Sequence, residues 1–262
     1  MAQDSPAASL EPGPLVVLGS EWGPQGCQLR IRRPGNTSEL IEAVGLELNY
    51  RADPSDPRHC VGHHSSTRNE GRYVDCHNRP QAGEKTCVSC AVADAEFASD
   101  LHHAHTRPAD EIHESVRHHL QQTNILYLAA FRDGSIKVGT STRTRRQTRL
   151  LEQGAWRAVE VAEVGDGFAV RRLEDVVTNR LGLPQAVATT RKLRGMVNPR
   201  SDVEVEEVLA GRTAEVHALL AGPDGRAAAD GAIPTSIAWS SPEADDPRWD
   251  RPHPYPLAIE TG

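Results

Sequence analysis

The chain has 262 residues and a formal net charge of −7 at pH 7, with 38% hydrophobic and 4% aromatic residues, 21 Gly and 18 Pro. The length allows one large domain or two small ones, and the Gly and Pro content predicts long loops or tails beside a folded core. The acidic balance excludes nucleic-acid binding through a global positive field, so such a surface must be a local basic patch. Because the sequence has no long apolar run and no charged-then-apolar leader, we expect a cytoplasmic, soluble protein without a membrane partner.

The N-terminal part predicts a disordered leader followed by a β-rich platform. Residues 1–14 hold Pro, Ala, Ser and acidic residues without periodicity. Residues 15–18 and 27–32 have the composition of strands, and residues 40–48 fit either a strand or a short helix. Cys27 lies alone on a predicted strand, where we expect a buried small apolar side chain rather than a reactive thiol.

Four cysteines follow in a short segment, and the last two form a C-x-x-C pair. They are Cys60, Cys76, Cys87 and Cys90. Four thiolates with one close pair are typical of a tetrahedral structural Zn²⁺ site, so we predict a zinc-binding module over residues 15–95. Disulfides are less favoured because nothing indicates secretion and cytosolic thiols stay reduced. A redox-active C-x-x-C is less favoured because a thioredoxin-like βαβ pattern is absent.

Histidines offer an alternative ligand set for this zinc site. The first gap between cysteines is long for a zinc ribbon, so a histidine can replace one cysteine as ligand. The candidates are His59, His63, His64 and His77.

Residues 96–122 predict a His-rich helical linker. The segment contains Glu114 directly after His113, which invites comparison with the H-E-x-x-H motif of metalloproteases. Arg117 stands where the second histidine would be required, so we reject a metalloprotease. A solvated or cleft-lining helix is the expected structure.

A strand, a tight turn, a second strand and a basic helix come next. Residues 125–131 are an apolar run rich in β-formers, Asp133-Gly134 is a common two-residue hairpin signal, and residues 135–139 run back. An Arg-rich segment follows a possible helix start. We expect this arrangement to bring the phenol of Tyr127, the ammonium of Lys137 and the guanidinium of Arg149 together at one edge of a small sheet.

The strand pair resembles the core of a GIY-YIG nuclease domain, whose two strands carry a Gly-Ile-Tyr-like and a Tyr-Ile-Gly-like triplet. The triplet Leu-Tyr-Leu at 126–128 matches the first at Tyr127. The triplet Lys-Val-Gly at 137–139 matches the second at Val138 and Gly139, with Lys137 in place of the second tyrosine. A side chain at position 139 would intrude between the hairpin and the next helix.

The resemblance extends to the helices after the hairpin. In that family an Arg on the first helix, with a polar or aromatic residue four positions on, faces the same cleft, and Arg149 and Gln153 fit these places. A Glu on the next helix holds a metal ion, and Glu174 fits. The match covers about residues 121–195. With the cysteine module it extends from about 55 and resembles a family of uncharacterised bacterial proteins that join a zinc module to a GIY-YIG-like domain.

The resemblance implies a metal-dependent endonuclease, a hydrolase that cleaves phosphodiester bonds in DNA or RNA. Glu174 would hold Mg²⁺ or Mn²⁺, and Arg149 would bind the scissile phosphate. Tyr127 would act as the general base, or position the water, if the nearby positive groups cause its phenol to lose its proton. Lys137 would neutralise charge near the phosphate. The remaining nucleic-acid contacts would come from Arg143, Arg145, Arg146 and Gln153.

Two other functions stay open at this point. One is a zinc-stabilised nucleic-acid-binding protein without cleavage activity, supported by Lys137 in place of the tyrosine. The other is a regulatory interaction module whose arginines contact an acidic partner.

The predicted fold class is α+β, with the β-rich zinc-binding module followed by a small GIY-YIG-like sheet flanked by helices over residues 123–200. Residues 168–181 predict one of these helices. Residues 201–222 predict a helical extension of one broken or two short helices around Gly211, and residues 223–262 predict a Pro/Gly-rich tail.

Overall fold

The computed structural model describes residues 13–23, 26–43, 46, 58–65, 72–94, 104–112, 116–117, 120–229 and 231–245. The chain divides into two compact units, Met1–His103 with Ile112–Val116 and Ala104–Glu111 with Arg117–Gly262. The predicted leader, except for its last two residues, and much of the His-rich linker, including His113 and Glu114, lie outside the described residues. Within the ranges given above, no helix is both long and apolar enough to cross a membrane.

The first unit contains a three-stranded antiparallel sheet in the order β1-β2-β3, which agrees with the expected β-rich platform. Its strands are β1 (Val16–Gly23), β2 (Gly26–Arg32) and β3 (Glu39–Glu42). The segment that fits either a strand or a helix therefore starts as a strand. A separate antiparallel pair, β4 (His63–Ser65) and β5 (Arg72–Val74), precedes a helical segment that begins at Val88.

A buried ion pair joins β2 to the chain that follows β5. Arg32 is only 4% exposed, and its Nη1 lies 2.6 Å from Asp75 Oδ1 and donates to the Cys76 carbonyl at 2.7 Å. The backbone N–H of Ser38 donates to the other oxygen of Asp75 at 2.7 Å. Burial raises the pKa of Asp75, but the Ser38 and Arg32 hydrogen bonds outweigh it and hold that pKa below its usual range. The sheet is thereby fixed to the segment that carries Cys76.

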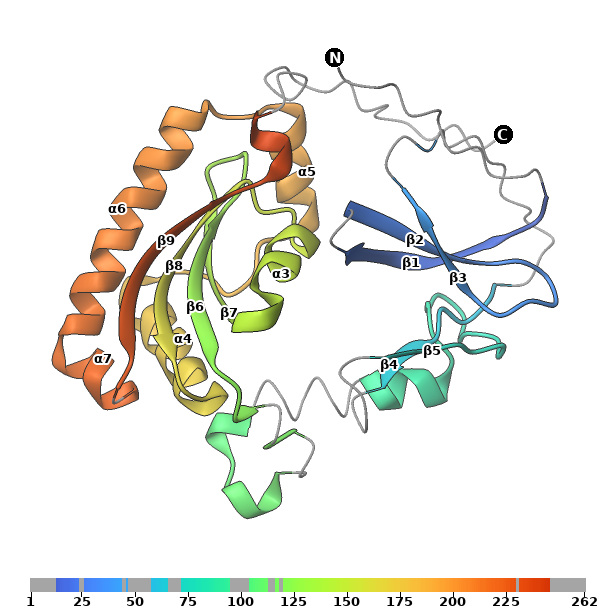
Figure 1. Ribbon diagram of the computed structural model, residues 1–262, viewed down its shortest axis with the longest axis horizontal. Coiled ribbons are helices and arrows are strands. Elements are labelled where there is room, and N and C mark those ends of the chain that lie inside the picture. The colour runs from blue at the N-terminus through green and yellow to red at the C-terminus, as the bar shows by residue number, and fades with distance from the viewer. Residues whose placement is uncertain are drawn as a thin grey trace. The chain divides into compact units, whose positions relative to one another are not determined.

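The second unit is built on a four-stranded antiparallel sheet in the order β7-β6-β8-β9 (Figure 1). The predicted hairpin forms its first two strands, β6 (Asn124–Ala130) and β7 (Ile136–Thr142). Gly134 has a φ of 79°, the left-handed region that favours glycine, and Phe131 N–H donates to Ser135 O at 2.9 Å to close the turn.

The C-terminal part of the sheet differs from the expected tail. Residues 223–245 form α7 (Pro223–Ala228), β9 (Ile233–Ser240) and the short η4 (Pro242–Asp245). β9 pairs with β8 (Arg157–Val164) along the sheet edge. This pairing joins residues far apart in the sequence, so the local Gly, Ala and Pro content does not reveal it.

The predicted helical extension is one continuous helix, α6 (Asp202–Ala221), rather than a broken one. Ser201 and Glu204 form a reciprocal capping box at its start. Gly211 is exposed and stays helical, since a single glycine costs only about 1 kcal/mol in a helix interior. Packing of the apolar face of a helix this long against the sheet outweighs that cost.

Helices cover both faces of the sheet, so β6 is buried along its whole length. Leu126 and Leu128 pack in the core that also holds Leu173 of α4 (Gly167–Leu181) and Val205 of α6. The opposite face packs against α3 (Arg146–Glu152), which follows the short η3 (Arg143–Arg145). Figure 1 shows α4, α6 and α7 on one side of the curved sheet and α3 on the other.

The outer edge of β7 is partly covered by the chain between α4 and α5 (Thr189–Val197). The N–H of Val138 donates to the Pro184 carbonyl at 3.0 Å. This segment and α5 bring further polar side chains to the face of the sheet where α3 lies.

Candidate metal centre and active site

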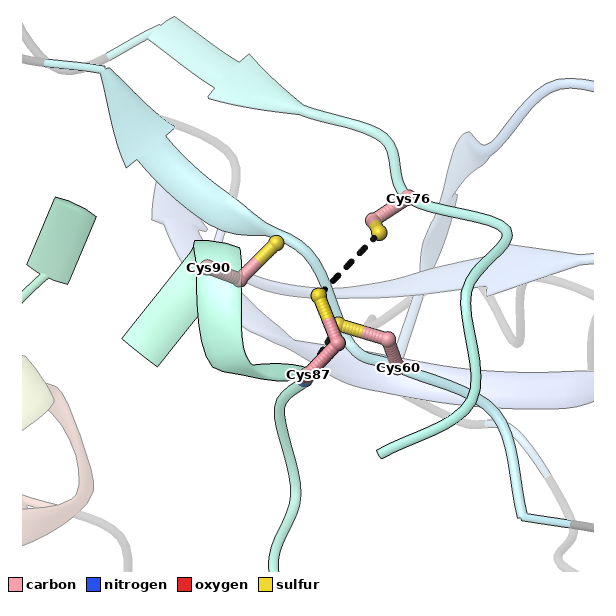
Figure 2. A group of neighbouring side chains, drawn as sticks. All are labelled: Cys60, Cys76, Cys87 and Cys90. Atoms are coloured by element: carbon pink, nitrogen blue, oxygen red, sulfur yellow. Dashed lines mark hydrogen bonds between the residues drawn. The ribbon is translucent and has the colours of Figure 1, made fainter. Parts of the chain in front are cut away.

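Four cysteines of the first unit point toward a common centre (Figure 2). Cys60 precedes β4 and Cys76 follows β5, so the strand pair brings them together. Val61 N–H donates to Lys85 O at 3.1 Å, which places Cys87 beside them, and the helical segment from residue 88 carries Cys90. The four Sγ atoms all lie within 4.8 Å of one another.

The sulfur geometry fits a tetrahedral metal site and not a disulfide. Cys76 Sγ and Cys87 Sγ are 3.8 Å apart, whereas a disulfide bond is about 2.05 Å long. Zn–S bonds of about 2.3 Å place tetrahedral sulfurs at about 3.8 Å from each other. Four thiolates this close together repel one another, and a cation among them would remove that repulsion. The cysteines can therefore hold a metal ion such as zinc.

Hydrogen-bond donors surround the sulfurs, as is usual around metal thiolates. The N–H groups of Gly62 and Cys87 lie 3.4 and 3.2 Å from Cys60 Sγ. His63 Nδ1 lies 3.3 Å from Cys90 Sγ. His63 thus accompanies a complete set of four cysteines and replaces none of them.

A second cluster lies in the other unit, on the face of the sheet next to α3, and is centred on Tyr127. This side chain is 1% exposed. Gln153 Nε2 donates to its Oη at 2.6 Å and to the Arg149 carbonyl at 3.1 Å. Gly139 lies opposite on β7, where an added Cβ would come within 2.6 Å of the Tyr127 hydroxyl. The glycine therefore makes the room in which the phenol lies, and the three atoms nearest to the added Cβ belong to Tyr127 rather than to the next helix.

The phenol of Tyr127 keeps its proton. Burial raises its pKa, and the Glu174 carboxylate acts in the same direction. The Gln153 hydrogen bond and the Arg149 guanidinium oppose the change without reversing it. The positive neighbours lower the pKa of Tyr127, as expected from the sequence, but the loss of water around the phenol raises it by more.

Lys137 is buried beside the tyrosine, at 7% exposure. Its Nζ donates to the Gln185 carbonyl at 3.0 Å. Burial, followed by the positive charge of Arg149, lowers the pKa of Lys137 to about 8, while Glu174 acts in the opposite direction. Lys192 on α5 also lowers this pKa, so its ammonium is close enough to repel that of Lys137.

Glu174 lies on α4 and is 4% exposed. Its Oε2 is 2.8 Å from Arg171 Nη1, an ion pair along one helix turn. The negative charge of its carboxylate raises the pKa of Tyr127 and that of Lys137. The structure therefore brings Tyr127, Lys137, Arg149, Gln153 and Glu174 together from two strands and two helices; with Lys192 we call these residues the Tyr127 cluster.

The expected basic strip is less positive than its sequence indicates, since carboxylates face it. Arg143 and Arg145 are largely exposed, and neither reaches Tyr127 through a described contact. The ion pairs are Arg143–Glu163 at 3.0 Å, Arg145–Glu152 at 2.9 Å, Arg146–Glu160 at 3.0 Å and Arg149–Glu152 at 3.6 Å. The pairs of Arg143, Arg145 and Arg149 are exposed, so they contribute little stability and can exchange partners, whereas Glu160 is buried.

Several residues around the Tyr127 cluster were not predicted from the sequence. Neither Lys192 nor Arg171 is among the site residues expected from it. A second polar chain leads from Lys137 through Gln185, whose Nε2 donates to Asp175 at 2.9 Å, to His105, whose Nε2 is 2.7 Å from the same carboxylate. Nothing in the local pattern around His105 signals this long-range contact.

These features define a protein of mixed α and β structure with two units, one holding a four-cysteine cluster that can bind metal and the other a buried polar cluster on a sheet. The chain belongs to the family described as "Protein of unknown function (DUF2797)", which it matches over residues 49–237. The match includes the four cysteines and the Tyr127 cluster, and it ends within β9. No curated protein and no solved structure matches the chain.

Proposed function

We propose that the protein is a metal-dependent nuclease whose second unit is GIY-YIG-like and whose substrate is DNA or RNA. The observation that carries the proposal is that five side chains spread over residues 127–174 are linked by a hydrogen bond or by electrostatic effects on one another's pKa, in the order that this motif requires. A hairpin supplies Tyr127 and Lys137, the next helix supplies Arg149 and Gln153, and the helix after β8 supplies Glu174.

Each side chain has a role that its surroundings support. Arg149 is 47% exposed at its side chain and presents a planar fork that matches two phosphate oxygens. The oxygen of Tyr127 accepts from Gln153, which leaves the phenolic O–H to donate to a phosphate oxygen or to the attacking water. Lys137 places a positive charge beside both.

Glu174 is the proposed ligand of a divalent metal ion. Mg²⁺ commonly binds proteins through one or two carboxylates together with substrate phosphates and water. Glu174 is the carboxylate that acts on Tyr127 and Lys137, and Arg171 is its present counterion at 2.8 Å. A bound ion would take over that neutralising role, and it would stabilise the charge that develops on the phosphoryl oxygens.

The four-cysteine cluster is proposed to be a structural zinc site. All four ligand positions are supplied by the protein, as in structural sites, whereas a catalytic zinc keeps one position open. Its role would be to stabilise the first unit.

The nuclease proposal is tested with labelled single- and double-stranded DNA and RNA, Mg²⁺ or Mn²⁺, and two matched variants. Glu174→Gln removes the proposed metal ligand, and Glu215→Gln removes an exposed carboxylate of α6 that pairs with Arg212. We expect cleavage by the wild type and Glu215→Gln, and a loss of about 100-fold or more in Glu174→Gln. Equal cleavage by both variants would remove Glu174 from the mechanism.

A second candidate is a nucleic-acid-binding protein that does not cleave. The Arg171–Glu174 ion pair favours it, since a carboxylate already neutralised in a buried position has less need of a metal ion. Binding of all these substrates without cleavage by the wild type would establish the second candidate in place of the first.

A further inference from the structure

We propose that Lys192 on α5 is a phosphate-binding residue of the Tyr127 cluster, which makes α5 part of the substrate site and a terminal phosphate dianion its preferred ligand. The inference rests on the proposed function in that it concerns the same site. It is nevertheless tested by binding alone, without a divalent metal and without cleavage.

The contacts of Lys192 place its ammonium at the cluster and not in the surrounding solvent. Its Nζ donates to the Gln153 carbonyl at 2.8 Å and lies 4.6 Å from the centre of the Phe131 ring. The same Gln153 donates to Tyr127 Oη through its side chain. Lys192 is therefore one residue removed from the phenol, although 65 positions separate the two in the sequence.

Among the described residues, the ammonium groups of Lys137 and Lys192 have no carboxylate as an ion-pair partner. In the part of the chain that the structure describes, Lys137 and Lys192 donate to the neutral carbonyls of Gln185 and Gln153 and form no ion pair. Glu174, the carboxylate that acts on Lys137, is already paired with Arg171. Two ammonium groups are thus left without a counterion beside Arg149.

Burial and neighbouring positive charges lower the pKa of both lysines. Burial lowers the pKa of Lys192, and Arg149 lowers it further. After burial, the positive charges of Arg149 and Lys192 also lower the pKa of Lys137. Burying like charges together is unfavourable for the protein alone, and a bound anion with two negative charges would neutralise both ammonium groups at once.

The donor set favours phosphate over a carboxylate. Two ammonium groups, one guanidinium fork and the O–H of Tyr127 can supply more donors than the two oxygens of a carboxylate accept, whereas a terminal phosphate presents three oxygens. An internal phosphodiester has a single charge and two such oxygens, so it would leave one ammonium group unneutralised.

The test measures affinity in the absence of divalent metal for inorganic phosphate and for two oligonucleotides that differ only in a 5′-phosphate or a 5′-hydroxyl. Lys192→Met keeps an unbranched side chain of similar length and removes the charge. Lys192→Arg restores a charge, and Arg194→Ala removes an exposed charge from the same helix. We expect tighter binding of the 5′-phosphorylated oligonucleotide, and a loss of about tenfold or more in Lys192→Met. Lys192→Arg should recover most of the affinity, and Arg194→Ala should stay within about twofold of the wild type.

Several results would overturn the inference. The inference fails if Lys192→Met binds phosphate as tightly as the wild type does. It also fails if the wild type does not bind phosphate, or if the wild type prefers the 5′-hydroxyl oligonucleotide. A loss of affinity in Lys192→Met that Lys192→Arg does not recover would assign Lys192 a packing role instead. A wild type that binds but never cleaves refutes the nuclease proposal and leaves this inference intact.

Discussion

Gln153 Nε2 donates a 2.6 Å hydrogen bond to Tyr127 Oη, and this bond joins the most buried strand of the sheet to the end of α3. Because the bond occupies a lone pair of the phenol, it also directs the phenolic proton away from Gln153. The Tyr127→Phe variant removes the hydroxyl group, and with it this proton, while keeping the ring.

We expect Tyr127→Phe to lose about 1 kcal/mol of unfolding free energy, the usual contribution of one hydrogen bond, since Gln153 keeps its contact with the Arg149 carbonyl. Cleavage should fall by about 100-fold, as for other donors to a developing charge. Urea unfolding and a cleavage assay on the same samples separate the two effects. Unchanged cleavage would show that the hydroxyl is structural only.

The contact between Gly139 and Tyr127 predicts that even one methyl group is too large at position 139. In Gly139→Ala the new Cβ would lie 2.6 Å from the phenol of a fully buried ring, so the ring or the strand must move. We expect a loss of about 1–3 kcal/mol of unfolding free energy. Gly165→Ala is the control, because nothing lies within 4 Å of a Cβ added there. Equal stabilities of the two variants in urea would contradict the prediction.

Metal removal should affect the two units differently. We expect one zinc ion per chain, and a chelator should increase hydrogen exchange in β4, β5 and the helical segment from residue 88 while leaving β6 and β8 protected. Cys87→Ser should lose the metal, whereas Cys27→Ser should keep it, since Cys27 lies on β2 outside the cluster. Zinc retained at one ion per chain by Cys87→Ser would exclude the four-cysteine site.

The lowered pKa of Lys137 predicts that the stability of the folded chain depends on pH. Its pKa is about 8 in the folded chain against an ordinary 10.5, so the unfolded chain holds a proton there that the folded chain releases between these values. The contribution of Lys137 to stability therefore rises with pH across this interval, and below about pH 8 the full cost of the buried charge is present.

The affinity for an oligonucleotide should fall with rising pH, whereas the contribution of Lys137 to stability rises. As Lys137 loses its charge, the affinity for an oligonucleotide should decrease while the pH rises through about 8. In Lys137→Arg the charge persists, and the decrease should move to higher pH. Fluorescence anisotropy from pH 6.5 to 9.5, a range chosen to span that value, measures both proteins. Identical profiles would exclude Lys137 as the titrating group.

The sequence predicted best what depends on neighbouring residues. The hairpin at Asp133-Gly134 formed as expected because turn chemistry is local. The C-x-x-C spacing places Cys87 directly before the helical segment whose first turn carries Cys90. Tyr127, Lys137, Arg149, Gln153 and Glu174 were placed in one cluster through a motif that specifies which elements carry them.

What the sequence did not predict depends on long-range contacts. β9 is defined by its pairing with β8, and Lys192 enters the cluster because α5 lies against Phe131. The raised pKa of Tyr127 depends on how far burial outweighs the positive charge of Arg149, a balance that the sequence does not give. The carboxylates opposite the arginines, such as Glu160 and Glu163, belong to β8, a strand absent from the predicted elements.

The buried Arg32–Asp75 pair has a practical consequence for defining the smallest stable piece of this protein. The family match begins at residue 49, so a shortened chain that keeps only the matched segment lacks β1, β2 and β3. Asp75 would then lose Arg32 and the Ser38 N–H, and the Cys76 carbonyl would lose its donor, directly beside a metal ligand. Heterologous production of the cysteine module therefore calls for a start point before Val16 rather than at the edge of the family match.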